Sequence, residues 1–278
     1  MTLATLDEVL RTAIAQGRGV GAFNVIQIEH AEAFVAAAER TGLPVVLQIS
    51  QNTVAYHGAL APIALATKEL ATAASARCVL QLDHALSEPL IEEAVTLGFT
   101  SVMFDGSTFD DASNRKRTTA VAERCHAAGV SVEAELGEIG GKEGVHTAGA
   151  RTDPQEAMRF AEQTGIDALA VAVGSSHAMT SRTAELDLEL ITKIKKVVPV
   201  PLVLHGSSGV RESTLTDAVR AGMVKINIAT HLNRFFTAAL SDFIAANAGV
   251  VDTRKYLGVA RTAVEEEAAR LLQLLALR

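Results

Sequence analysis

Three histidines follow or end apolar segments of this 278-residue chain, and together they could bind a metal ion. His84 directly follows the segment 78–83, while His177 comes shortly after a second such segment and His205 lies within a third. Three neutral imidazoles with one open coordination position are a common arrangement around a catalytic zinc ion. The alternative is that these are solvated or hydrogen-bonded histidines at the ends of strands.

Four acidic residues accompany the histidines. Asp83 precedes His84 at the end of its segment, where its carboxyl group could exchange a proton with a substrate. Asp105 and Glu135 lie at or near the ends of two further segments. They could form a hydrogen-bonded structural pair, a second and looser cation site, or hydrogen bonds that support the histidines. Glu143 lies in the Gly-rich segment 137–152, as a solvated residue or as an acid/base that loop closure brings in.

Small residues mark a third kind of feature, an anion site. HGSSGV (205–210) and NIAT (227–230) follow the last two apolar segments. Backbone N–H groups of such small residues can approach an anion closely, and the loops after strands seven and eight are a frequent phosphate site in barrel enzymes.

These groups need a scaffold that brings the ends of distant segments together. Eight short segments rich in Val, Ile and Leu alternate with Ala-rich stretches of helical spacing, as expected for parallel strands covered on both faces. One helix is predicted to begin with Asp153 as its N-cap and Pro154 at its first position. Eight such units predict a single (β/α)8 TIM barrel, with a doubly wound open sheet as the alternative. The segments span residues 19–25, 44–50, 78–83, 101–105, 131–137, 168–173, 201–206 and 223–229.

No composition shift or linker divides the chain, so one domain is expected over residues 1–278. The amphipathic run 265–278 predicts a C-terminal helical extension that either caps the barrel or packs on a partner. The net charge of −7 argues against nucleic acid or an anionic membrane as a partner. With neither a signal peptide nor a spanning stretch of roughly 18 apolar residues, a soluble, cytoplasmic protein is expected.

A metal site, a phosphate site and two carboxylates favour one reaction class. The metal polarises a carbonyl group, one carboxylate removes the neighbouring proton, and a second carboxyl group handles the hydroxyl proton of the aldehyde partner. That chemistry is an aldol addition or its reverse.

The motifs LQLDHA, SVMFDGS, VGSSHA, HGSSG and GMVKINIAT, in this order, resemble those of the class II (metal-dependent) fructose- and tagatose-bisphosphate aldolases. The resemblance extends from AFNV (22–25) to DTRKYLG (252–258). It implies cleavage of a ketose bisphosphate, of the fructose 1,6- or tagatose 1,6-bisphosphate type, to dihydroxyacetone phosphate and an aldehyde such as glyceraldehyde 3-phosphate. It also implies a homodimer or homotetramer in carbohydrate metabolism.

Carried over by position, His84, His177 and His205 would bind the catalytic Zn²⁺. Asp83 would transfer the proton of the C4 oxygen, and Glu143 would act at C1 of dihydroxyacetone phosphate. Asp105 and Glu135 match positions where some members hold a second ion, and some members hold a monovalent cation (Na⁺ or K⁺) near the zinc histidines. The residues expected to face the substrate are Asn24, Ser50, Ala178, Gly206, Ser207, Ser208, Asn227, Ile228, Ala229 and Thr230.

Departures from the family pattern concern the aldehyde half of the substrate. Ala229 is the tagatose-type residue where fructose-bisphosphate enzymes often have Asp, and a common lysine position is occupied by Ser181. Arg182 is the candidate replacement for that lysine. The acceptor could therefore be a different or an unphosphorylated aldehyde. Two further alternatives are a metal-free aldolase that forms a Schiff base on Lys225 and a non-catalytic sugar-phosphate-binding homologue.

Overall fold

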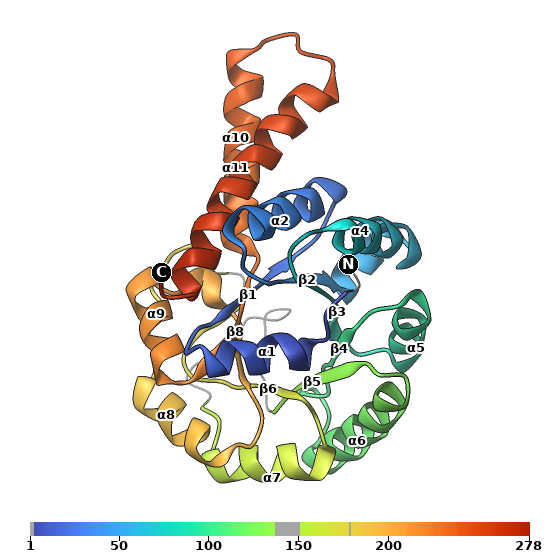
Figure 1. Ribbon diagram of the computed structural model, residues 1–278, viewed down its shortest axis with the longest axis vertical. Helices are drawn as coiled ribbons and strands as arrows, with labels where there is room; N and C mark the ends of the chain where they lie inside the picture. The colour runs from blue at the N-terminus through green and yellow to red at the C-terminus, as the bar shows by residue number, and fades with distance from the viewer. Residues whose placement is uncertain (1–2, 137–150, 178) are drawn as a thin grey trace.

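Eight parallel strands close into a barrel in the order β1 to β8, and helices surround it (Figure 1). The computed structural model describes residues 3–136, 151–177 and 179–278. This topology confirms the predicted (β/α)8 TIM barrel and rules out the open sheet. The strands are β1 (Val20–Asn24), β2 (Val45–Ser50), β3 (Cys78–Ala85), β4 (Ser101–Phe104), β5 (Ser131–Glu135), β6 (Ala168–Ala170), β7 (Leu202–Leu204) and β8 (Met223–Ile228).

Several helices begin at a residue whose side chain accepts from free backbone N–H groups of the first turn. Asp153 caps α7 as predicted: its carboxylate accepts from the N–H groups of Gln155 and Glu156, and Pro154 occupies the first turn. The helices are α1 (Leu6–Ala15), α2 (Ile28–Thr41), α3 (Gln51–His57), α4 (Ala61–Ala73), α5 (Glu88–Leu97), α6 (Asp111–Ala127), α7 (Pro154–Thr164), α8 (Leu188–Val197), α9 (Glu212–Ala221), α10 (Thr230–Ala246) and α11 (Thr253–Leu275), with a short 3₁₀ helix, η1 (Ser207–Gly209).

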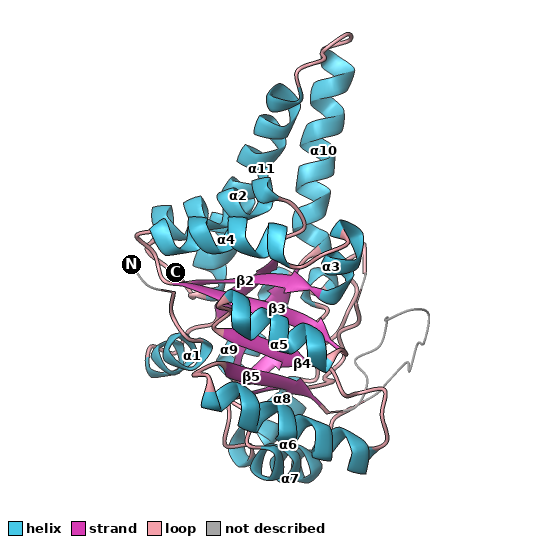
Figure 2. Cartoon of the chain, turned by 90° about the vertical axis from the view of Figure 1, so that its right-hand side faces the viewer, coloured by secondary structure: helices cyan, strands magenta, loops and turns pink. Residues whose placement is uncertain are grey.

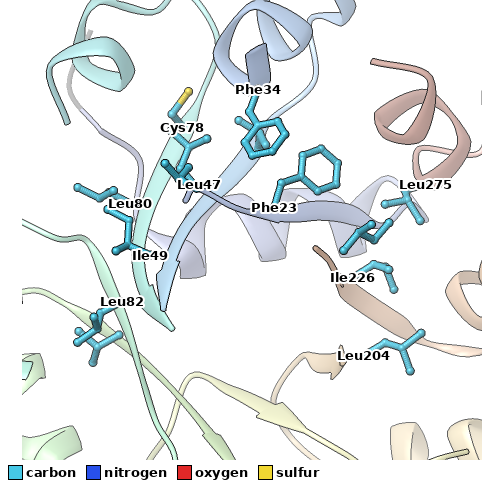
Figure 3. Packing of buried hydrophobic residues seen from close by; sticks show 14 of the residues in the cluster. Phe23, Phe34, Leu47, Ile49, Cys78, Leu80, Leu82, Leu204, Ile226 and Leu275 are labelled. Atoms are coloured by element: carbon cyan, nitrogen blue, oxygen red, sulfur yellow. The ribbon is translucent and has the colours of Figure 1, made fainter. Parts of the chain in front are cut away.

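The hydrophobic core has two parts. The larger part lies between the barrel and its helices, where Phe23, Leu47 and Leu80 from the strands pack with Phe34 from α2 (Figure 3). The smaller part fills the barrel and includes Val46 together with buried residues of α1. Helix α1 lies across the end of the barrel at which the strands begin (Figure 1). That end is therefore closed, and the opposite end is left for a site.

Inside the barrel, the apolar layer next to α1 is followed by a polar one. Gln48, Gln81, Glu133 and Lys225 are completely buried, although their side chains are amides or charged groups. Strands of a parallel barrel direct alternate side chains inward, and these four inward positions lie below the carboxyl ends of β2, β3, β5 and β8.

The predicted C-terminal helical extension is confirmed: most of the run 265–278 lies in α11, which pairs with α10 in a helical hairpin. Helices α10 and α11 extend away from the barrel side by side (Figures 1 and 2), and α11 returns to pack on α2. Ile244, Val251 and Val259 on this hairpin are exposed. Among the described residues, no helix has both the length and the apolar character needed to cross a membrane.

Candidate active site

The three predicted metal-binding histidines converge at the carboxyl end of the barrel. His84 is the penultimate residue of β3, His205 follows β7, and His177 lies in the segment after β6. One ring nitrogen of each lies within 4.8 Å of one on the others. Nε2 of His84 and Nδ1 of His205 are 3.1 Å apart, close to the about 3.3 Å that separates two nitrogen ligands of a tetrahedral zinc ion with bonds of about 2.0–2.1 Å.

A β-bulge allows two consecutive residues of β3 to face this end of the barrel. Between Leu82 and Ala85, β3 has one residue more than its neighbour β4, and His84 has a φ of 50°. A left-handed conformation costs a non-glycine residue about 1–2 kcal/mol. The bulge interrupts the alternation that would otherwise send Asp83 and His84 to opposite faces. Both side chains therefore reach the same cavity.

Carboxylates contact the ring nitrogens of His84 and His205 that face away from the cluster. Asp105 Oδ2 lies 2.9 Å from Nδ1 of His84, and Glu133 Oε1 lies 2.9 Å from Nε2 of His205. Such contacts fix the orientation and tautomer of metal-binding histidines. Burial lowers the pKa of His205 to about 4, outweighing the Glu133 contact that raises it. His205 is therefore neutral, the form that binds metal, and this donor set fits Zn²⁺.

Glu133 is ionised in this network. Burial by itself raises the pKa of Glu133, but the charge of Lys225 and the contact with His205 lower it below the ordinary range of a carboxyl group. Lys225 Nζ lies 2.7 Å from Glu133 Oε2 and donates to Asn227 Oδ1 at 2.9 Å. The Lys225 amine is thus engaged by two acceptors inside the barrel and is not among the described residues that line the cavity, a placement that is unsuited to forming a Schiff base with a substrate.

Asp83 is held in a fixed position beside the histidines. Gln48 Nε2 donates to its Oδ1 and Asn24 Nδ2 donates to its Oδ2, each at 3.0 Å. The side chain is almost completely buried but borders the cavity. Asp83 is thus placed to exchange a proton with a bound molecule.

A cavity of about 170 Å³ opens above the histidines. All of its described lining residues except one were predicted from the sequence. No lysine or arginine is among these described residues. The lining residues are Asn24, Ser50, Asn52, Asp83, His84, His177, Gly206, Ser207, Ser208, Asn227, Ala229 and Thr230.

The predicted phosphate loops form one wall of this cavity. Thr230 begins the long helix α10, whose N-terminal N–H groups and dipole favour an anion. Gly206 has a φ of 67°, and a Cβ atom there would come within 2.5–2.8 Å of the backbone of Ser176. Only glycine fits at this position, where the loop after β7 packs against the loop that carries His177.

Other predicted residues lie apart from this cavity or outside the described residues. Asp105 and Glu135 form with His84 a second group whose ligand atoms lie within 4.8 Å of one another. Ile228 is buried in β8. Arg182 is not among the lining residues, and its Nη1 lies 2.6 Å from Glu212 Oε1. Glu143 and Ala178 fall outside the described residues.

Several residues at the site were not predicted, among them Gln48, which donates to Asp83. Asn52 lines the cavity from α3, and Glu133 contacts His205 from inside the barrel. Glu133 lies two residues before Glu135 in SVEAELG, so the alternation of side chains along a strand would have been a sufficient signal to place both on the same face.

A larger cavity of about 460 Å³ opens near Arg18, Pro44 and Arg77, where strands begin. Barrel enzymes carry their chemistry at the other end.

The chain matches the family described as class II fructose-bisphosphate aldolase over residues 4–277. A fructose-bisphosphate aldolase of Thermus caldophilus is 39% identical, over 95% of this chain and 95% of its own length. The chain belongs to the class II fructose-bisphosphate aldolase family. It is therefore an aldolase, a lyase, of a class that is generally metal-dependent.

Solved structures of related proteins share the fold. The YdjI aldolase of Escherichia coli K12 superposes with a TM-score of 0.88 at 29% identity, covering 99% of this chain and 97% of that one. A putative fructose-1,6-bisphosphate aldolase of Coccidioides immitis has a TM-score of 0.86 at 26% identity, covering 96% and 94%. The relatives include aldolases with different names, so the family alone leaves the substrate open.

Proposed function

We propose that this protein is a Zn²⁺-dependent aldolase that reversibly cleaves a ketose phosphate to dihydroxyacetone phosphate and an aldehyde. The observation that carries the proposal is the convergence of one ring nitrogen from each of three histidines within 4.8 Å of one another, with His84 and His177 lining the same cavity as Asp83. His84, His177 and His205 would hold the metal. When bound, the metal ion supplies Lewis-acid polarisation of the substrate carbonyl group.

The residues of the chain then divide the proton transfers between them. In the cleavage direction, Asp83 takes the proton of the C4 hydroxyl group as the carbon–carbon bond breaks and the aldehyde leaves. Glu143 returns a proton to the carbon that becomes C1 of dihydroxyacetone phosphate. The hydrogen bonds from Asn24 and Gln48 to Asp83 support its role, because they orient the carboxylate before the substrate arrives.

The dihydroxyacetone phosphate half would bind along the wall formed by Gly206, Ser207, Ser208, Ala229 and Thr230. Its phosphate group would lie at the N-terminus of α10, where helix dipole and backbone N–H groups are available. Ala178 and Ile228 belong to the same proposal. Asp105 and Glu135 are proposed either to hold a second ion or to support His84, and a monovalent cation (Na⁺ or K⁺) is proposed near His177 and His205.

The aldehyde half is proposed to be glyceraldehyde 3-phosphate, from fructose or tagatose 1,6-bisphosphate. A specific observation favours a second candidate, an unphosphorylated or differently charged aldehyde. No lysine or arginine is among the described lining residues, and the guanidinium group of Arg182 is paired with Glu212. Binding of a second phosphate by Arg182 would require that this ion pair open.

A panel of aldehydes tests both candidates. Each aldehyde, with and without a phosphate group, is assayed for condensation with dihydroxyacetone phosphate, and kcat/KM is compared. The first candidate predicts that glyceraldehyde 3-phosphate is preferred over unphosphorylated glyceraldehyde, and the second predicts the reverse. No condensation with any aldehyde, in protein shown to contain zinc, would contradict the proposed reaction.

We further propose a cytoplasmic homodimer or homotetramer. The hairpin of α10 and α11 supports an oligomer, because it projects from the barrel (Figure 2) and its Ile244, Val251 and Val259 are exposed. Light scattering coupled to size-exclusion chromatography gives the mass directly, and the mass of a single 29.2 kDa chain at micromolar concentration would contradict the proposal.

A further inference from the structure

A charged network lies inside the barrel directly below the metal-binding histidines. Glu133 is at its centre, with Lys225 Nζ at 2.7 Å and Gln81 Nε2 at 3.0 Å from its Oε2. Glu133, Lys225 and Gln81 are each completely buried. An ion pair at this depth is costly compared with apolar residues of similar volume. Its presence next to the apolar layer of the barrel therefore calls for a reason other than stability.

The geometry around Glu133 assigns the tautomer of His205. The two donors, Lys225 and Gln81, meet at Oε2, which leaves Oε1 to accept from His205 Nε2 at 2.9 Å. A carboxylate accepts hydrogen bonds and does not donate them, so Nε2 of His205 must carry the hydrogen. Asn227 Nδ2, at 3.2 Å from the same nitrogen, is then a van der Waals neighbour rather than a hydrogen-bond partner.

This assignment leaves the lone pair of His205 on Nδ1. Nδ1 faces Nε2 of His84 at 3.1 Å. Nδ1 of His84 is in turn 2.9 Å from Asp105 Oδ2, which leaves Nε2 as the nitrogen of His84 that faces His205. Nδ1 of His205 and Nε2 of His84 thus face the same space, where a metal ion would bind both.

We propose that Glu133, held in place by Lys225 and Gln81, is a positioning residue that fixes His205 in the tautomer and orientation required to bind the metal through Nδ1. The inference rests on the proposed function in one respect, the assignment of His205 as a metal ligand. Lys225 acts through Glu133: its ammonium group occupies Oε2 and so directs Oε1 towards the imidazole.

Glu133→Gln tests the tautomer with almost no change in shape. The amide oxygen of glutamine would accept from the two donors, Lys225 and Gln81, which turns its NH₂ group towards Nε2 of His205. Nε2 must then be the acceptor, and the hydrogen moves to Nδ1, the nitrogen that faces the metal site. The affinity for Zn²⁺ is expected to fall roughly 10- to 100-fold, as is usual when the outer partner of a metal ligand is lost.

A matched substitution and a double variant separate positioning from folding. Glu267→Gln makes the same change at another buried glutamate, which contacts His231 Nε2 at 2.6 Å. Its affinity for Zn²⁺ should remain within about twofold of wild type. The double variant Glu133→Leu with Lys225→Met removes the buried charge pair and should remain folded. It nevertheless leaves His205 without its acceptor, and its affinity should fall as in Glu133→Gln.

The experiment measures metal binding by metal-free full-length protein. Zn²⁺ affinity is obtained by competition with a chromophoric chelator, and the Co²⁺ form is examined by its visible absorption spectrum. Glu133→Gln and the double variant should both bind Zn²⁺ more weakly and show an altered Co²⁺ spectrum. Thermal unfolding is recorded for each variant to show that it is folded. Wild-type affinity and an unchanged spectrum in Glu133→Gln would overturn the positioning role while the proposed function stands. Failure of the wild-type protein to bind Zn²⁺ or Co²⁺ would overturn both.

Discussion

Replacing Asp83 with alanine should separate two proton transfers that cleavage normally couples. In the proposed reaction, Asp83 serves only the C4 oxygen, so carbon–carbon cleavage should fall by about 10²–10⁴, the range for loss of a positioned acid/base. This corresponds to about 2.7–5.4 kcal/mol of activation free energy. Exchange of the C1 proton of dihydroxyacetone phosphate with solvent involves no aldehyde and should remain measurable. Glu143→Ala should show the opposite pattern and lose the exchange.

The structure sets the conditions for this comparison. Removing the Asp83 carboxylate leaves Gln48 with its second acceptor, Gln81 Oε1 at 3.2 Å, and leaves Asn24 next to the cavity. Only a modest loss of stability is therefore expected, at most about 1–3 kcal/mol. Because His84 is adjacent, zinc content must first be shown to equal that of wild type. If zinc remains bound and both variants lose exchange equally, the division of labour is wrong. Normal exchange in Glu143→Ala would show that Glu143 has no role at C1.

Three further substitutions test separate features. Arg182→Ala should lower kcat/KM selectively for phosphorylated aldehydes, by roughly 10-fold or more, because a hydrogen bond to a charged group contributes about 1.5–3 kcal/mol. Equal effects on unphosphorylated aldehydes would show that Arg182 does not contact the phosphate group of the aldehyde. Gly206→Ala should lower the free energy of unfolding in urea by more than about 1 kcal/mol, because the new methyl group would meet the backbone of Ser176. Wild-type stability of this variant would refute the close approach of Gly206 to Ser176. Burial lowers the pKa of His30 to about 4. As pH falls below about 6.5, His30 is therefore protonated in the unfolded chain before it is protonated in the folded protein. The free energy of unfolding should drop by up to about 3 kcal/mol between pH 6.5 and 4. In His30→Leu this part of the pH dependence of stability should be absent. A stability profile identical to that of wild type would refute the contribution of His30.

The strand pattern was sufficient to predict the barrel and the end that carries the site. Continuous apolar segments ending in polar residues require that the strands be parallel and that their carboxyl ends meet. The C-terminal helix predicted over 265–278 is confirmed in α11, but its packing on α2 was not predicted, because that contact joins segments more than 200 residues apart and has no local signature. The strand ends were less accurate: β6 is only three residues long, whereas the segment 168–173 predicted six.

The site shows where local alternation is insufficient. Strict alternation along β3 would send Asp83 and His84 to opposite faces, but the bulge in β3 turns both towards the cavity. Nothing in the letters DHA marks a bulge, since it depends on the register with β4. Glu133 and Lys225 were separately recognisable as inward-facing polar residues, but their pairing across the barrel depends on closure of the sheet.

The central claim is that this aldolase depends on a metal ion held by three histidines. The most direct test is to measure zinc by elemental analysis and cleavage activity on the same sample during extensive chelation, and again after Zn²⁺ or Co²⁺ is added. Zinc content and cleavage should fall together and recover together, and His205→Ala should lose both while remaining folded. Full cleavage activity in a preparation that elemental analysis shows to be free of metal would contradict the claim.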